Sequence, residues 1–417
     1  MALKHDVLPR NTAVWVFVVL AAAYFLSTLL RAITATLAPV LTDEFGMQAR
    51  DLGLLAGAYF LGFSITQLPM GHWLDRHGPK KVVLSFLCVA VLGCFAFAWA
   101  HDFKGLLLSR VLIGVGVSAC LMAPLTGYRR WLASEQQQRA NSWMLMTGAL
   151  GMLTSTLPVQ WLLPMVGWRW MFVVLALLVA LSMAVIYWKV PAWRLSEPTQ
   201  NDETISATTS TKGIMASYQQ VWTHSYFRRL APMGFFNYGG MIAMQTLWAG
   251  PWMVKVAGYT PLEAATGLFW LNVCMLLTFW LWGLMTPSLT VRGYDANKLL
   301  TYGVPLSLCA QVAIILGGQD AGAAYWVVFC VFSSFVALAQ PAVGMAFPSA
   351  LAGRALSAYN LILFLGVFVV QWGMGLMIDG FKAMNWTEPQ AFQGAMSVFL
   401  ICCIASYGYF LKHRPES

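Results

Sequence analysis

The chain has 417 residues, of which 59% are hydrophobic and only 10% are charged. Soluble domains carry about 25% charged residues, so this composition excludes a soluble globular protein and indicates a membrane protein. The net charge of +9 does not indicate a nucleic-acid partner, because the basic residues are spread over many short loops and form no single stripe.

The sequence has twelve apolar segments long enough, at about 20 residues, to cross a bilayer. They lie at residues 13–40, 51–71, 82–100, 105–128, 140–164, 170–190, 230–256, 262–286, 298–317, 322–347, 355–378 and 391–411. The connections are short except for a polar stretch rich in Ser and Thr, which predicts a mobile linker. We therefore expect one six-helix bundle at 1–190, a linker at 191–229 and a second six-helix bundle at 230–417.

The distribution of basic residues predicts the orientation of the chain. With the N-terminus inside, 18 Lys and Arg side chains fall on the inner side and 5 on the outer side. Cytoplasmic loops carry the excess of positive charge in membrane proteins. We expect a multi-pass protein of the cell inner membrane with both termini and the linker in the cytoplasm.

The first predicted span contains one arginine, Arg31. It follows Ala13 by 18 residues, which is about 27 Å along a helix and places it in the outer half of the membrane. An ionisable residue at this depth usually faces a cavity and marks a substrate path. The alternative is a side chain that extends to the outer surface.

The loop after the second span has the sequence Gly-His-Trp-Leu-Asp-Arg-His-Gly-Pro-Lys-Lys, from Gly71 onward. It resembles the signature between the second and third helices of the major facilitator superfamily (MFS), and every defining position is filled. The alternative is an ordinary basic loop with one acid. The resemblance implies a role in gating for Gly71, Asp75, Arg76 and Gly78.

A carboxylate is stabilised at the N-terminus of a helix, where unpaired backbone N–H groups gather. We expect Asp75 to approach the start of the eleventh helix, near Ser357, in one conformation of the carrier. That contact would close the inner gate.

The fourth span contains a second MFS-like pattern, which begins at Arg110 and continues to Gly114 and Gly116. In the family this arginine is often linked to coupling, and the glycines allow helices to approach closely. The alternative is that Arg110 lies near the outer end and extends to the interface. The Gly-Pro-rich motif typical of many drug antiporters is not evident in the fifth span, which weakens a drug-efflux interpretation.

Every Asp and Glu lies in a loop, at a terminus or at a predicted span boundary. A cavity that contains Arg31 and lacks a carboxylate is positive and favours an anion. Several MFS carriers of organic anions have an arginine in the first helix, and this stretch looks like theirs. The nearest candidate for a proton-coupling acid is Asp51, at the start of the second span.

In MFS proteins, helices 1, 4, 7 and 10 surround the substrate path. Neutral polar residues on the first, seventh and tenth predicted spans are therefore candidates, with Arg31, for substrate binding: Tyr24, Asn237, Tyr238, Gln245 and Gln340. The alternative for each is a hydrogen bond between helices.

The eight cysteines lie in apolar stretches without metal-ligand spacing, so we expect buried packing roles. No catalytic constellation, metal site or cofactor motif is visible, which argues against a membrane-bound enzyme. A sensor should carry an added soluble domain, and none is visible.

The resemblance implies an all-α membrane protein with twelve transmembrane helices in two six-helix pseudo-repeats, which works by alternating access. We predict a secondary transporter, of the symporter type, for a small organic anion such as a carboxylate metabolite. The alternative is a proton-driven exporter of drugs or metabolites. The expected partners are the substrate, the lipid bilayer and a coupling proton; no nucleic acid is expected, and the protein should be a monomer.

Overall fold

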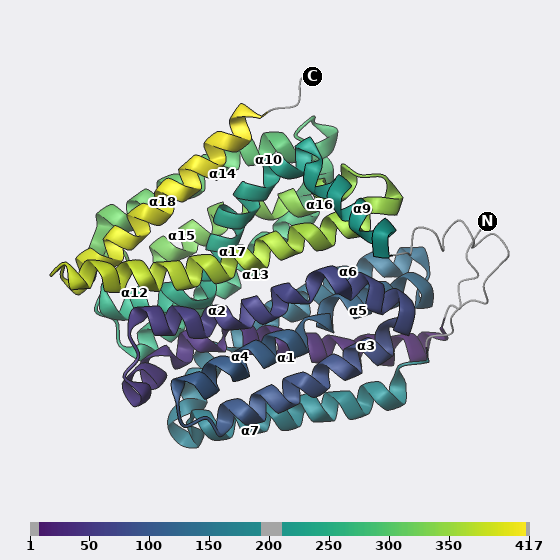
Figure 1. Cartoon of the computed structure of the whole chain (residues 1–417), viewed down its shortest axis with the longest axis horizontal. Helices are drawn as coiled ribbons and strands as arrows, with labels where there is room; N and C mark the ends of the chain where they lie inside the picture. Colours follow the sequence, from purple (N-terminus) through teal and green to yellow (C-terminus); the bar gives the residue numbers. More distant parts are fainter. Residues whose placement is uncertain (1–7, 193–210, 414–417) are drawn as a thin grey trace.

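The computed structural model describes residues 8–192 and 211–413, and within these ranges it contains helices and no strands. The first half comprises α1 (Arg10–Phe45), α2 (Ala49–Ile65), α3 (Gln67–Ala98), α4 (Phe103–Val117), α5 (Ala119–Trp131), α6 (Ser134–Thr154) and α7 (Leu157–Lys189). The second half comprises α9 (Thr211–Thr223), α10 (Ser225–Met233), α11 (Gly239–Ala243), α12 (Ala249–Lys255), α13 (Pro261–Val291), α14 (Ala296–Gly317), α15 (Ala323–Ser333), α16 (Ala339–Met345), α17 (Ser349–Ala383) and α18 (Glu388–Lys412). Two π-helical turns, η2 (Gly234–Tyr238) and η3 (Met244–Trp248), and two 3₁₀ turns, η4 (Gly318–Asp320) and η5 (Ser334–Leu338), join these helices. Figure 1 shows the first half in purple through blue to teal and the second half in teal through green to yellow, as two layers of long helices packed against each other.

The helices account for the twelve predicted spans. In the described part of the chain, nine helices are long and apolar enough to cross a membrane, and the bent pair of α2 and the start of α3 makes a tenth. The other two are α6 with the first turns of α7, and the series from α10 to α12, which η2 and η3 interrupt. The backbone turns at Gly78 (φ 77°) and Gly167 (φ 74°), so α3 and α7 each contain the end of one span and the whole of the next. Only glycine adopts such angles at little cost, because it has no Cβ atom.

Several helices continue past the predicted ends of their spans. The eleventh span was predicted at 355–378, whereas α17 begins at Ser349 and ends at Ala383. The difference arises because the hydrophobic run stops at polar residues, while the helix itself continues beyond the bilayer core.

The second part of the expected linker is helical. Within 191–229, α9 covers Thr211–Thr223 and α10 begins at Ser225, while residues 193–210 lie outside the described residues. Tyr218 on α9 donates a hydrogen bond to the backbone oxygen of Leu68 in the first half (3.0 Å). Arg354 on α17 donates to Ser217 in α9. Burial raises the pKa of Tyr218 although Arg354 opposes this shift, so the phenol keeps the proton that it donates. The helix therefore bridges the two halves.

The two halves meet most extensively where α2 and α17 run antiparallel. Glycines make this approach possible: a Cβ on Gly53 would lie 2.3 Å from the carbonyl oxygen of Gln371, and one on Gly375 would lie 2.3 Å from that of Ala49. Nearer the middle of the pair, the rings of Phe63 and Phe364 contact each other, with centroids 4.5 Å apart.

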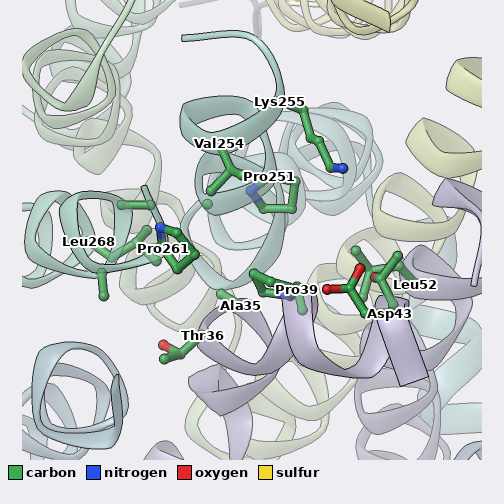
Figure 2. Close-up of a pocket in the computed structure, with 15 residues that line it drawn as sticks. Ala35, Thr36, Pro39, Asp43, Leu52, Pro251, Val254, Lys255, Pro261 and Leu268 are labelled. Atoms are coloured by element: carbon green, nitrogen blue, oxygen red, sulfur yellow. The ribbon is translucent and has the colours of Figure 1, made fainter. Parts of the chain in front are cut away.

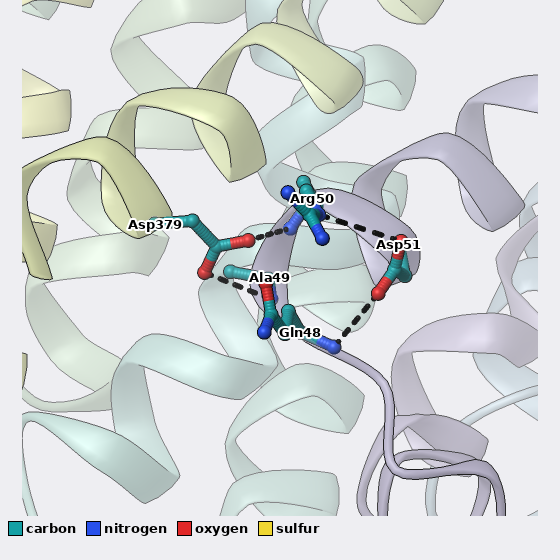
Figure 3. A network of polar contacts seen from close by, with 5 residues as sticks. All are labelled: Gln48, Ala49, Arg50, Asp51 and Asp379. Carbon is teal, nitrogen blue, oxygen red and sulfur yellow. Dashed lines mark hydrogen bonds and ion pairs between the residues drawn. The ribbon is translucent and has the colours of Figure 1, made fainter. Parts of the chain in front are cut away.

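A polar network joins the N-terminal end of α2 to the C-terminal end of α17, on the side that we expect to face outward (Figure 3). The carboxylate of Asp379 on α17 accepts hydrogen bonds from the backbone N–H groups of Ala49 (3.2 Å) and Arg50 (2.8 Å), at the N-terminus of α2. We call this contact the outer latch. Asp51 does not face inward from this end, because its carboxylate accepts from the backbone N–H of Gln48 (3.1 Å) and lies 3.8 Å from the Arg50 guanidinium.

The cysteines do not all have the expected buried positions. Four are buried: Cys94, Cys120, Cys330 and Cys403. Cys88 and Cys309 are exposed on the protein surface, so the expectation of buried packing is wrong for these two. A thiol behaves as a small apolar group, and such a group is also tolerated on a helix face that contacts lipid.

Candidate functional site

Arg31 lies between the two halves and does not extend to the outer surface. The Cζ atom of its guanidinium is 5.4 Å from the centre of the Phe63 ring and 5.7 Å from that of the Phe364 ring. Its Nε atom is buried and has no hydrogen-bond partner in the described part of the chain. A buried, unpartnered donor is unfavourable unless a ligand or water completes it. This atom therefore makes Arg31 a candidate position for a ligand.

Three phenols surround this guanidinium. Tyr59 on α2, Tyr24 on α1 and Tyr238 in η2 all lie close enough to interact electrostatically with Arg31. The hydroxyl of Tyr59 donates to the backbone oxygen of Ser27 (3.2 Å). Within the described ranges, the hydroxyls of Tyr24 and Tyr238 have no hydrogen-bond partner. The structure thus brings together three of the predicted site residues, Arg31, Tyr24 and Tyr238, from both halves of the chain.

The three predicted amides are engaged in hydrogen bonds with neighbouring helices of the second half. Their side-chain N–H groups donate from Asn237 to Ser406 (2.8 Å), from Gln245 to Asn272 (3.0 Å) and from Gln340 to Asn360 (2.6 Å). Each bond joins two different helices of the same bundle. The alternative interpretation, hydrogen bonding between helices, therefore describes how these residues are held in this conformation.

Tyr238 and Gln245 lie in η2 and η3, where the helix is locally widened. Such π-helical turns are rare and often occur at functional sites, because the extra residue changes the direction of a side chain. The sequence contained no signal for them.

Arg110 is fully buried, with 0% of its surface exposed, so the alternative in which it extends to the interface is wrong. Its Nη1 atom donates to the backbone oxygen of Leu30 (2.9 Å), and its Cζ atom lies 5.2 Å from the centre of the Tyr59 ring. A Cβ on Gly114 would lie 2.0 Å from the Tyr59 carbonyl oxygen, so α4 contacts the backbone of α2 directly. Arg110 and Gly114 therefore support the residues that adjoin Arg31.

The MFS-like stretch from Gly71 to Lys81 was predicted as a loop but lies within α3, where the backbone turns at Gly78, at the opposite end of α2 from the outer latch. Gly78 has φ 77° and forms the turn between two spans, while Arg76 is exposed. A Cβ on Gly71 would meet no atom within 4 Å, so no close packing requires a glycine there. The side chain of Asp75 is outside what the structure describes.

Asp75 was expected to approach the start of the eleventh helix near Ser357, but that helix starts earlier in the chain. Because α17 begins at Ser349, the unpaired N–H groups lie in the turn that follows Ser349. Ser357 lies well inside the helix and is 5% exposed, so it does not mark the helix start.

A cavity of about 240 Å³ lies beside the part of α1 that follows Arg31 in the sequence (Figure 2). It is lined by residues of α1 and α2 on one side and of α12 and α13 on the other, including Ala35, which follows Arg31 by one turn of α1. The lining is mainly apolar, with Asp43 and Lys255 near its outer end. The cavity is therefore a space between the two halves.

Three residues of this site were not predicted from the sequence: Tyr59, Phe63 and Phe364. Aromatic residues are frequent throughout the apolar spans, so composition did not distinguish these three. Only the packing of α2 against α17 shows that they surround a charged group.

Comparisons with known proteins agree with this architecture. The family model described as Major Facilitator Superfamily matches residues 20–416. The hexuronate transporter of Escherichia coli strain K12 is 23% identical over 304 residues, which is 69% of this chain and 68% of that protein. The "Probable L-galactonate transporter" of the same strain is 21% identical over 66% of this chain, but the match spans only 59% of that protein. The chloramphenicol resistance protein CraA of Acinetobacter baumannii is 27% identical over 37% of this chain and 38% of its own length.

Two solved structures have the same fold over nearly the whole chain. One is a bacterial homologue of the human lysosomal transporter Spinster in an inward-facing conformation (TM-score 0.77, 16% identity, 98% of this chain and 99% of that chain). The other is a D-xylose–proton symporter (TM-score 0.76, 15% identity, 97% and 98%). Together with the twelve spans and the family model, these matches show that the chain belongs to the major facilitator superfamily.

Proposed function

We propose that this protein is a secondary active transporter for a small organic anion that carries a carboxylate group, and that it works by alternating access. The observation that carries the proposal is the guanidinium of Arg31, whose Nε is buried and unpartnered between the two halves. The hydroxyls of Tyr24 and Tyr238 lie in the same cluster and are free of protein partners in the described residues. Together they make a positive, donor-rich site.

The chemistry of this cluster favours a carboxylate. A guanidinium presents a planar fork of N–H groups that can hold both oxygens of a carboxylate by parallel hydrogen bonds. The rings of Phe63 and Phe364 contact the guanidinium, and the phenols can donate further hydrogen bonds. Because Arg31 belongs to the first half and Tyr238 to the second, one anion can contact both bundles. A site at the interface of two repeats is what alternating access requires.

The relatives support this substrate class and also keep one alternative open. Hexuronates and galactonate, named for two relatives, carry a carboxylate. The relative named for chloramphenicol resistance favours the second candidate, a proton-driven exporter of drugs or metabolites. The two candidates differ in the direction of transport: deletion of an exporter causes its substrate to accumulate in cells, whereas deletion of an importer abolishes uptake.

We further propose that the carrier works as a monomer in the cell inner membrane, as a proton-coupled symporter with both termini in the cytoplasm. This orientation is supported by the basic residues, because it places 18 of them on the inner side and 5 on the outer side. A reporter inserted at position 208 tests it, because a periplasmic signal there would contradict the two-bundle topology. The proposed domains are the bundle 1–190, the segment 191–229 and the bundle 230–417.

Substitution of Arg31 tests the proposed function. Hydrogen bonds to charged groups contribute about 1.5–3 kcal/mol each, so Arg31→Ala should weaken binding of an anion such as D-glucuronate by roughly tenfold or more. Arg31→Lys keeps the charge but loses the fork, so it should give an intermediate loss. The measurement is the binding constant of the purified protein for D-glucuronate and for its uncharged counterpart D-glucose.

The matched control is Arg50→Ala, which removes the same charge from an exposed side chain at the outer end of α2. It should leave the binding of both sugars unchanged. Equal losses for the charged and the neutral ligand in Arg31→Ala would show that Arg31 supports only the fold. Failure of the wild type to bind a panel of carboxylates would overturn the proposed substrate class.

A further inference from the structure

The guanidinium of Arg31 lies over two adjoining aromatic rings that come from different halves of the protein. Phe63 belongs to α2 and Phe364 to α17, and their ring centres lie 5.4 Å and 5.7 Å from the Arg31 Cζ atom. The two rings also contact each other, at 4.5 Å between centroids. Phe60, one turn before Phe63, stacks on Phe364 at 6.3 Å. The position of Phe364 is therefore fixed by the first half, although the residue belongs to the second.

Rings placed in this way control the orientation of a guanidinium. The face of an aromatic ring attracts a cation within about 6 Å, and more strongly where water is excluded. The two rings occupy one side of the Arg31 guanidinium, and its Nε atom has no partner in the described residues, so that donor is available to a ligand. Removing one of the two rings would let the side chain turn into other rotamers.

We propose that Phe364 is a positioning residue for Arg31: its ring, supplied by the second bundle, holds the guanidinium with its N–H edge open to the substrate anion. Since Phe364 is carried on α17, movement of α17 relative to α2 also moves the ring relative to Arg31. The affinity for the anion therefore depends on the position of the second half relative to the first. The effect on substrate rests on the proposed function, whereas the orientation of Arg31 does not.

The chain offers a matched control on the same helix. Phe368 lies one turn further along α17, is partly buried like Phe364, and also packs on α2, where a Cβ on Gly57 would meet its ring at 2.9 Å. Its ring contacts Trp372, at 5.8 Å between centroids. Phe368→Leu removes an equal ring from the same interface and leaves the contacts of Arg31 in place. Phe364→Tyr keeps the ring and should restore what Phe364→Leu loses.

The first measurement needs no substrate. Phenylglyoxal reacts with accessible guanidinium groups, and mass spectrometry of the peptide that contains Arg31 gives the rate for this residue alone. Phe364→Leu should change this rate several-fold, whereas Phe368→Leu and Phe364→Tyr should react like the wild type. Equal rates for Phe364→Leu and Phe368→Leu would overturn the proposal, whatever the substrate.

The second measurement is binding of D-glucuronate and D-glucose. Phe364→Leu should weaken D-glucuronate binding by roughly three- to thirtyfold and should leave the weak binding of D-glucose unchanged. In the Arg31→Ala background, Phe364→Leu should have little further effect, because a residue that acts through another loses its role when that residue is removed. Independent losses in the double variant would overturn the positioning role.

The outcomes separate the two proposals. If the wild type binds no carboxylate but the phenylglyoxal rates differ as expected, the positioning of Arg31 stands and the proposed substrate class fails. If carboxylate binding depends on Arg31 but Phe364→Leu behaves like Phe368→Leu in both measurements, the proposed function stands and the role of Phe364 fails.

Discussion

Arg110 is a charged group enclosed by the helices of the first bundle. One of its nitrogens donates to the backbone oxygen of Leu30, but its Nε and Nη2 atoms are buried without a partner in the described part of the chain. A buried donor left unsatisfied costs about 1–3 kcal/mol. Replacing such a charge by an apolar residue of similar volume is often neutral or stabilising. Stability alone therefore gives no reason for an arginine at this position.

We expect Arg110→Met to keep or raise the thermal midpoint of the purified protein and to lower transport by roughly tenfold. A tenfold change corresponds to about 1.4 kcal/mol. We expect this cost because Arg110→Met removes the hydrogen bond to the backbone oxygen of Leu30, the residue next to Arg31. The two measurements are thermal unfolding and uptake by vesicles, each normalised to the amount of folded protein. A lower thermal midpoint with normal uptake per folded molecule would show that Arg110 is structural only.

The residues of the site differ in how far sequence could predict them. Arg31 was predictable because a charge inside an apolar run is a local feature. The pairing of Arg31 with Phe364 was not, since it depends on how two distant helices are rotated against each other. Similarly, an amide such as Gln340 inside a span indicates a polar partner, but the identity of Asn360 as that partner depends on the register of two helices.

At the scale of helices, the number of spans was predictable and their ends were not. Run length determines how many segments cross the bilayer, whereas helix breaks depend on backbone angles such as φ 77° at Gly78. The helical part of the linker, α9, was missed because it is polar and short. Tyr218 on this helix donates its hydrogen bond to Leu68, which is far away in the sequence, so no local pattern predicts the contact.

The pair formed by α2 and α17 leads to a prediction about the outer latch. Two backbone N–H groups of α2 donate to the Asp379 carboxylate, so a full negative charge lies at a helix N-terminus. Such a charge contributes about 0.3–1 kcal/mol, or up to ~2 kcal/mol when partly buried. Asp379→Asn keeps the shape but removes the charge, so it should weaken the closed outer side and increase the population of the outward-open carrier by about two- to thirtyfold.

Spin labels at Lys104→Cys and Met384→Cys, at the outer ends of the two halves, would report this opening as a longer distance. The exposed Cys88 and Cys309 should first be replaced by serine. Glu388→Gln is the control, because that acid also lies at the outer side but contacts Lys382 within the second half (3.7 Å). An unchanged distance distribution in the Asp379 variant would show that the latch does not hold the outer side closed.

The whole molecule places its charges unevenly along the membrane normal. Arg31 and Arg110 lie inside spans, whereas the acids whose side chains the structure describes lie at helix ends or in turns. Asp51, the nearest candidate for proton coupling, is part of a capping box at the outer end of α2, with 31% of its side chain exposed. Its carboxylate stabilises the start of a helix and contacts water, and it is directed away from the substrate cluster.

This arrangement predicts how transport responds to ion gradients. In sealed vesicles, Asp51→Asn should leave the accumulation of D-glucuronate driven by a pH gradient within about twofold of the wild type, because the Asn side-chain oxygen can still accept the hydrogen bond from the Gln48 N–H. Glu388→Gln, at the start of α18, serves as a control for loss of another acid on the same side. If Asp51→Asn abolished accumulation at normal protein levels while facilitated exchange continued, Asp51 would be the coupling group, and the proton would have to enter from the outer end of α2.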